Sequence, residues 1–318
     1  MIKAKRIILK NYCGYKNIDL DFSDGYSDIK KWAIFFGPNG IGKSNFIRAV
    51  EILTNVGMVK GRQSPRLFRQ LKYHQNYMSQ ISALQTNISD LKMEGFFLYS
   101  DDEIRKIVIE DTYKGILSKH VLKESLTKEA SDLIEWDKNN AVSGITLNEL
   151  PSCMSNFSIC VDADHPNNMQ KFQIYKELKE PFLDFAESVY GFKCDLPDVS
   201  ICLDKGIEFY TDFVLYKTWG TTVHYKSFSD GEKKIATLLS TLFKKAYKDS
   251  LGKGDEKIIL IDNIEMHIYW ERHMLLMNKM EEFFPDHQII CTTHSPIIIK
   301  EMPEKYLYNI EDILKKDS

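Results

Sequence analysis

The sequence lacks the marks of several protein classes. None of its six cysteines belongs to a C-x-x-C pair, which argues against a zinc site or a disulfide framework and favours reduced, buried thiols. No apolar run approaches the roughly 18 residues that a membrane helix needs. The first six residues, Met-Ile-Lys-Ala-Lys-Arg, are not followed by the apolar core of a signal peptide. We therefore expect a cytoplasmic protein with no membrane segment.

An excess of charge of either sign is also lacking. The chain has 42 Lys and Arg against 45 Asp and Glu, a net charge of −3 over 318 residues. This balance excludes a histone-like nucleic-acid binder, so that any contact with nucleic acid must come from a local patch. Sustained heptads are missing, which argues against a long coiled-coil arm. The length allows one large α/β domain or two smaller ones.

What the sequence does contain is an α/β pattern. Hydrophobic spacing predicts long helices, namely Asn45–Leu53, Gln170–Tyr190, Gly231–Tyr247 and Tyr269–Phe284. Short apolar runs predict buried strands, namely Trp32–Phe36, Ile258–Ile261 and Gln288–Thr292. Alternating segments predict hairpins, namely Ile7–Leu9 with Ile18–Phe22, Met93–Tyr99 with Arg105–Thr112, and Phe213–Tyr216 with Thr222–Tyr225.

A phosphate-binding loop lies between the first of these strands and the first helix. Gly37-Pro38-Asn39-Gly40-Ile41-Gly42-Lys43-Ser44 fits G-x-x-x-x-G-K-[ST] at every fixed position. Glycines let backbone N–H groups surround phosphate oxygens, and the helix N-terminus adds partial positive charge. We expect Lys43 to reach the β and γ phosphates and Ser44 to bind Mg²⁺, with Asn45 completing the site. A tight turn without a ligand is the alternative, and the flanking strand and helix disfavour it.

A second motif begins the helix near Gly231. In Phe228-Ser229-Asp230-Gly231-Glu232, Ser229 and Glu232 have the spacing of a capping box. Together with the phosphate loop, this string resembles the signature of the ATP-binding-cassette class of P-loop ATPases, which includes the SMC, RecF and OLD-like groups. The resemblance implies that Ser229, Gly231 and Glu232 face an ATP held by a second subunit, in a head-to-tail dimer around two ATP molecules.

A third motif ends the strand Ile258–Ile261 in Asp262, which suits a Mg²⁺ ligand. The segment Asp262–Trp270 resembles the D-E-P-E-x-H-L-H-P run of the RecF and OLD-like ATPases. Asn263 stands where that run has the glutamate that activates water, and an amide cannot take a proton. Two hypotheses follow. Either Glu265 is the base and hydrolysis is slow, or ATP serves mainly to hold a dimer together.

A fourth motif, Phe284–Pro296, resembles the F-P-x-x-Q-I-I-x-T-T-H-S-P segment of the same groups, which implies that His294 contacts the γ-phosphate. The resemblance covers residues 1–54 and 207–318. We expect these to form the core of a single composite domain, with residues 55–206 as a mainly helical inserted lobe and β flank. The glutamine of the lobe-connecting loop is undecided among Gln70, Gln75, Gln80 and Gln85.

The expected lobe contains two further features. No acidic residue lies between Glu51 and Asp90, whereas five cations do: Lys60, Arg62, Arg66, Arg69 and Lys72. Aromatic residues interleave with them, which suits nucleic acid, although an acidic protein partner or a solvated loop fits as well. Asp162 and Asp164 have the spacing of a TOPRIM metal pair, but a turn after a strand is the better interpretation. We expect no nuclease in this chain.

The motifs together predict an ATP-binding-cassette head that binds ATP and Mg²⁺. Proteins resembling it often serve in antiphage defence or DNA repair beside a nuclease or toxin effector, so we expect the ATPase component of such a system. The alternatives are a scaffold that binds nucleotide without hydrolysing it and, less favoured, a transporter ATPase.

Overall fold

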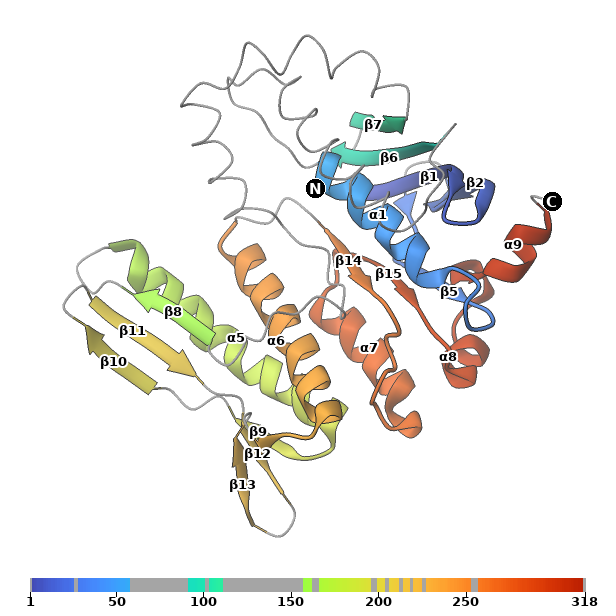
Figure 1. Ribbon diagram of the computed structural model, residues 1–318. Coiled ribbons are helices and arrows are strands. Elements are labelled where there is room, and N and C mark those ends of the chain that lie inside the picture. Colours follow the sequence, from blue (N-terminus) through green and yellow to red (C-terminus); the bar gives the residue numbers. More distant parts are fainter. Residues whose placement is uncertain are drawn as a thin grey trace, which may run out of the picture.

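A four-stranded parallel sheet forms the centre of the molecule (Figure 1). In the computed structural model its strands run in the order β14 (Ile258–Ile261), β15 (Gln288–Thr292), β5 (Trp32–Phe36) and β16 (Leu307–Asn309). The structure describes residues 2–25, 28–57, 91–100, 103–110, 157–161, 166–195, 199–203, 206–211, 214–217, 220–224, 227–252 and 257–316. β5, β14 and β15 have the bounds that their apolar runs predicted, and the α/β fold class is confirmed.

β5, β14 and β15 are buried on both faces, which explains the apolar run that each contains. Successive side chains of a strand point to opposite faces. In β5, Trp32 and Ile34 belong to one hydrophobic cluster, whereas Ala33 and Phe35 belong to another. β14 and β15 divide their side chains in the same way.

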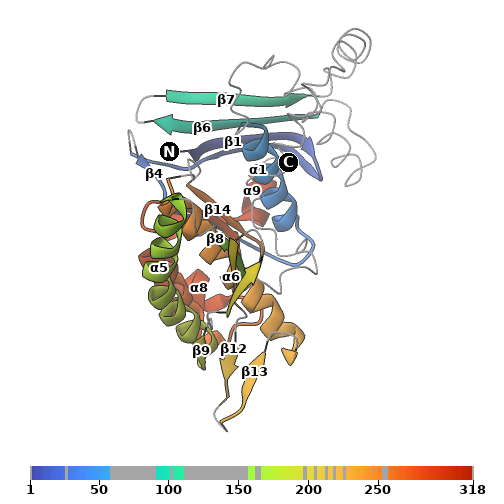
Figure 2. The ribbon, with the colours of Figure 1, turned by 90° about the vertical axis from the view of Figure 1, so that its left-hand side faces the viewer.

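One face of the central sheet is covered by helix α1 (Lys43–Gly57), which an antiparallel sheet covers in turn (Figure 2). Phe46 and Val50 of α1 share a cluster with Phe35 of the central sheet and Met93 of the antiparallel sheet. The antiparallel strands run in the order β2 (Tyr15–Asp21), β1 (Lys3–Tyr12), β6 (Lys92–Ser100) and β7 (Glu103–Glu110). The two predicted hairpins of this region are confirmed.

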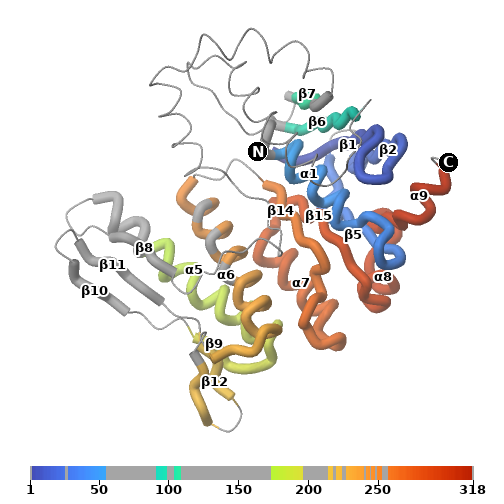
Figure 3. Tube along the Cα trace, viewed as in Figure 1, coloured from blue at the N-terminus to red at the C-terminus, as the bar shows by residue number. Residues whose placement is uncertain are grey.

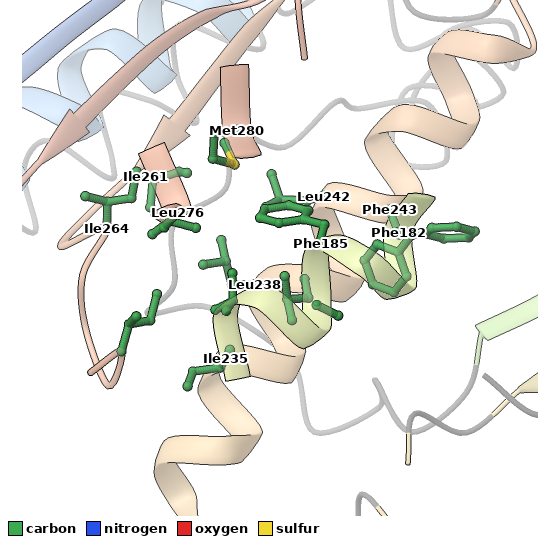
Figure 4. Packing of buried hydrophobic residues seen from close by; sticks show 14 of the residues in the cluster. Phe182, Phe185, Ile235, Leu238, Leu242, Phe243, Ile261, Ile264, Leu276 and Met280 are labelled. Atoms are coloured by element: carbon green, nitrogen blue, oxygen red, sulfur yellow. The ribbon is translucent and has the colours of Figure 1, made fainter. Parts of the chain in front are cut away.

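The opposite face is covered by three helices: α5 (Pro166–Tyr190), α6 (Asp230–Ser250) and α7 (His273–Phe283). Figure 4 shows how Phe182 and Phe185 of α5 and Leu242 of α6 gather with Leu276 of α7. The predicted helices are confirmed, with one difference in the last. Its first turn is a 3-10 helix, η2 (Trp270–Arg272), before α7 begins.

A buried glutamine joins the two sheets. Gln288, at the start of β15, donates from Nε2 to the carbonyl oxygen of Ala4 at 2.9 Å and accepts from the Ala4 N–H at 2.8 Å. Gln288 is fully buried, so these bonds replace its hydrogen bonds to water. β1 is therefore tied to the central sheet by a side chain as well as by the packing around α1.

Smaller elements complete the structure. Two antiparallel sheets lie beside α5: β10 (Val199–Leu203) with β11 (Gly206–Thr211) and β8 (Phe157–Val161), and β13 (Thr222–His224) with β12 (Val214–Tyr216) and β9 (Lys193–Asp195). The hairpin predicted around Gly220 is thus confirmed. The pair β3 (Ser23–Asp24) and β4 (Asp28–Ile29), the helix α8 (Pro296–Glu301) and the 3-10 turn η3 (Glu304–Tyr306) are shorter.

Both ends of the sequence contribute to one body, since the C-terminal α9 (Ile310–Lys316) lies beside β2 (Figure 3). Within residues 55–206, the described parts hold α5 and strands β6 to β10. The rest of this segment lies outside the described residues, so the predicted lobe stays a prediction. Among the helices that the structure describes, none combines the length and the apolar character needed to cross a bilayer.

Candidate nucleotide-binding site

Three of the predicted motifs follow neighbouring strands of the central sheet. The phosphate loop follows β5, Asp262 follows β14, and Thr293 and His294 follow β15. These strands are parallel and adjacent, in the order β14-β15-β5. Their carboxyl ends therefore share one edge of the sheet (Figure 1), which is where open α/β sheets bind ligands.

The phosphate loop depends on three glycines in left-handed backbone conformations. Gly37, Gly40 and Gly42 have φ values of 143°, 76° and 105°, which side chains rarely tolerate. Pro38, Asn39 and Gly40 are exposed. The loop thus turns its backbone outward at the start of α1, where helix N–H groups lack partners inside the helix. This arrangement suits an anion.

Lys43 is the cation of the loop. Its side chain is buried, and Nζ donates to the carbonyl oxygens of Gly37 at 3.0 Å and Pro38 at 2.9 Å. Burial lowers the pKa of Lys43 below its ordinary value, while the carboxylates of Asp262 and Glu265 act in the opposite direction. Lys43 therefore lies within electrostatic reach of the third motif, which contains Asp262 and Glu265. The neighbouring Ser44 is exposed and Asn45 is half-buried.

Asp262 is held by Thr292, the last residue of the neighbouring strand β15. Thr292 Oγ1 donates to Asp262 Oδ1 at 2.5 Å and accepts from the Asn263 N–H at 2.7 Å. Asn263 has a φ of 53°, a left-handed conformation that asparagine tolerates better than most residues. One hydroxyl thus fixes the carboxylate and the turn after it. A carboxylate here and the Ser44 hydroxyl on α1 are the oxygen donors that Mg²⁺ prefers.

Glu265 is anchored to the segment that carries His294. Its Oε2 accepts from Thr293 Oγ1 at 2.8 Å, and its Oε1 accepts from the backbone N–H of His294 at 2.6 Å. Thr293 is fully buried, whereas His294 is exposed. The structure therefore brings Glu265, the candidate base, into contact with the backbone of His294, and leaves the imidazole of His294 accessible.

The signature helix α6 begins with the predicted capping box. The Ser229 hydroxyl accepts from the Glu232 N–H at 3.3 Å, and Glu232 Oε2 accepts from the Ser229 N–H at 2.9 Å. Lys217 forms an ion pair with the other oxygen of Glu232. Burial alone would raise the pKa of Glu232, but the hydrogen bonds from Lys217 and Ser229 hold it below its ordinary value. The Glu232 carboxylate is thus engaged within the chain, while Ser229 and Asp230 are exposed.

The start of α6 lies against the turn that follows Asp262. A Cβ placed on Gly231 would come within 3.4 Å of His267 Nδ1, and Lys234 Nζ lies 3.9 Å from Met266 Sδ. Because β14 leads directly into this turn, the start of α6 and the Asp262 segment of the same chain lie side by side.

Sequence reasoning missed three residues that position this site. Thr292 and Thr293 stand in the T-T-H-S-P string, which pointed to His294 alone. Tyr15 donates from its hydroxyl to the Gly42 carbonyl oxygen at 2.6 Å, and no motif marked it. The sequence signal that could have identified the two threonines is their place at the end of a buried strand, as small polar residues near a carboxylate that needs orienting.

Other predicted residues lie outside the described part of the chain. These are the basic residues Lys60, Arg62, Arg66, Arg69 and Lys72, the glutamines Gln70, Gln75, Gln80 and Gln85, and the acidic pair Asp162 and Asp164. β8, the strand before that pair, is present.

Comparison with known proteins agrees with this geometry. Residues 215–300 match the family described as "AAA domain, putative AbiEii toxin, Type IV TA system". The crystal structure of an Smc head bound to the C-winged helix domain of ScpA superposes with a TM-score of 0.50 at 16% identity, covering 93% of this chain and 91% of that one. The chain therefore shares the fold of an Smc head. The family match over residues 215–300 begins in β12 and extends into α8, so it spans the signature helix, Asp262 and His294.

Two curated proteins to which the chain is similar come from bacteria. A Retron Vc95 probable ATPase of Vibrio cholerae serotype O1 biovar El Tor is 23% identical over 206 residues, which are 62% of this chain and 36% of the relative. A Septu protein PtuA of Bacillus mycoides strain KBAB4 is 20% identical over 303 residues, which are 93% of this chain and 38% of the relative. The chain spans less than two fifths of the length of either relative.

Proposed function

We propose that this chain binds ATP with Mg²⁺ at the carboxyl edge of its central sheet and hydrolyses it slowly. The observation that carries this proposal is the meeting of the phosphate loop, Asp262 and the Glu265–His294 pair on three adjacent parallel strands. Lys43 gives further support, because its buried ammonium group interacts electrostatically with the carboxylates of Asp262 and Glu265.

Each residue has a role in this proposal. The loop N–H groups and Lys43 bind the phosphates, and Ser44 and Asp262 would hold Mg²⁺, which when bound neutralises phosphate charge. Glu265 accepts the proton of the attacking water, and the Asn263 amide orients that water. His294 donates to the γ-phosphate. Each of the two Glu265 oxygens accepts one hydrogen bond and can accept a second. The carboxylate can therefore still take up a proton.

We propose further that two copies associate head to tail, with Ser229 and Gly231 of one copy facing the ATP of the other. The support is an exposed start of a 21-residue helix, next to the Asp262 turn. Residues 1–54 and 207–318 would form the core of one composite domain, with 55–206 inserted. Association beyond the dimer would need a further surface, because the dimer already uses the nucleotide contact of both copies.

At the level of the cell, we propose that the chain is the ATPase component of a bacterial antiviral defence system and controls a separate effector, such as a nuclease or toxin. The relatives named as a retron ATPase and a Septu protein support this over a role in DNA repair. The second candidate is a scaffold that binds ATP without hydrolysis and sequesters the effector, and Asn263 favours it.

Phosphate release under single-turnover conditions separates the two candidates. We expect wild type to release phosphate slowly, Lys43→Ala to lose ATP binding, and ATP to convert monomer to dimer in sedimentation, with Ser229→Arg remaining monomeric. Bound ATP that stays intact would favour the scaffold. Phage plating on cells that carry the chain with its genomic neighbours tests the defence role, and protection that survives Lys43→Ala would contradict it.

A further inference from the structure

A buried tyrosine of the antiparallel sheet supports the phosphate loop from within the core. The Tyr15 hydroxyl donates to the Gly42 carbonyl oxygen at 2.6 Å, and Tyr15 is only 1% exposed. We propose that Tyr15 is a positioning residue, which orients the peptide between Gly42 and Lys43 for phosphate binding. This inference rests on the proposed function, because it concerns the same loop.

The approach of the two residues is built into the local backbone. Tyr15 pairs with Tyr12 across the turn between β1 and β2, where Cys13 and Gly14 adopt left-handed conformations with φ values of 45° and 93°. A Cβ on Gly42 would lie 3.0 Å from the Tyr15 oxygen. Glycine at position 42 is therefore required for its φ of 105° and also for the close approach of the tyrosine.

The hydrogen bond acts on the phosphate side through the planarity of the peptide. The Gly42 carbonyl also accepts from the Phe46 N–H at 3.1 Å, as the first hydrogen bond of α1. In a trans peptide the C=O and the following N–H point in opposite directions. With the Gly42 carbonyl held toward the helix and Tyr15, the Lys43 N–H points out of the helix N-terminus, toward the place where the loop would hold phosphate.

The hydroxyl, and not the ring, carries this role. The ring packs in the cluster beneath α1, and phenylalanine would preserve that packing. Loss of the hydroxyl would leave the Gly42 carbonyl with the Phe46 bond alone, so the chain should fold while the loop samples more orientations. Tyr12 provides a matched control, since it is equally buried in the same turn. Within the described residues, no hydrogen bond from the Tyr12 hydroxyl reaches the phosphate loop.

The test compares Tyr15→Phe with Tyr12→Phe in the full chain. Affinity is measured with a fluorescent ATP analogue and Mg²⁺, and inorganic triphosphate is used as competitor. We expect Tyr15→Phe to weaken both ligands by about three- to tenfold, and Tyr12→Phe to remain within about twofold of wild type. A chain with 4-aminophenylalanine at position 15, which restores an N–H donor, should regain wild-type affinity and covers the case in which the phenylalanine variant folds poorly.

Equal affinity of wild type and Tyr15→Phe would overturn the inference, as would a loss seen with the ATP analogue and not with triphosphate, since the loop contacts phosphates alone. Failure of the proposed function has a different signature. In that case wild type and Lys43→Ala would bind the analogue equally weakly, whatever residue occupies position 15.

Discussion

Glu265 accepts a hydrogen bond from the backbone N–H of His294 at 2.6 Å. The two residues are 29 positions apart and follow different strands of the sheet. Because the bond involves the main chain of His294, the imidazole keeps its freedom while the position of the residue is fixed relative to Glu265. If phosphate binding moved the Glu265 segment or the His294 segment, this hydrogen bond would transmit the movement to the other segment.

The first prediction concerns the base. Glu265→Gln should bind ATP with nearly wild-type affinity and release phosphate at least about 100-fold more slowly, because an amide cannot accept the proton. Glutamine can still accept from the His294 N–H, so the local structure should persist. Steady-state phosphate release together with analogue binding measures this. Unchanged turnover in Glu265→Gln would show that the proton goes elsewhere.

The second prediction concerns Asn263. Asn263→Glu should raise phosphate release, since it places a carboxylate directly after Asp262. It should also lower the free energy of unfolding by about 1 kcal/mol, because the left-handed backbone disfavours a glutamate side chain. Asn263→Gly is the control, and we expect it to unfold no more easily than wild type. Urea unfolding of the three chains decides the matter, and equal stability of all three would contradict the argument from backbone conformation.

The third prediction concerns Thr292. Thr292→Val removes a hydroxyl that bonds to Asp262 and to the Asn263 N–H, and leaves both groups in a buried place. We expect a loss of about 1–3 kcal/mol in unfolding free energy and weaker dependence of ATP binding on Mg²⁺. Thr292→Ser keeps the hydroxyl and should retain most of both properties. A serine variant as impaired as the valine variant would contradict the assignment of the effect to the hydroxyl.

The fourth prediction is a pH dependence at the start of α6. The lowered pKa of Glu232 means that its contribution to stability is present above the ordinary value of 4.5 and is lost as pH falls through the lower folded value. Glu232→Gln should cost about 1 kcal/mol near pH 7, and the gap from wild type should close in acid. Unfolding curves between about pH 3 and pH 7 measure the gap, which we expect to be smaller at the acid end. A constant gap would exclude titration of Glu232 as its origin.

Strands and motifs were predictable from the sequence for a physical reason. β5, β14 and β15 are buried on both faces, so each is a continuous apolar run that a polar residue or glycine ends abruptly. The capping box at Ser229 was predictable because its two partners are three residues apart.

Contacts between distant residues were not predictable in the same way. Thr292 reaches Asp262 across 30 positions and Tyr15 reaches Gly42 across 27, and both depend on which strands become neighbours. The 3-10 turn η2 before α7 was not predicted either, and it follows His267, which has a φ of 66°.

Gln288 has a mechanical consequence. It stands at the first position of β15, and Thr293 and His294 follow the last. β15 is extended and pairs with β14 on one side and β5 on the other, so the distance between its two ends is nearly fixed. A displacement of Thr293 and His294 along the strand would therefore strain the two hydrogen bonds between Gln288 and Ala4. Ala4 lies in the antiparallel sheet, 284 positions before Gln288 in the sequence, so that sheet would respond to events at the opposite end of β15.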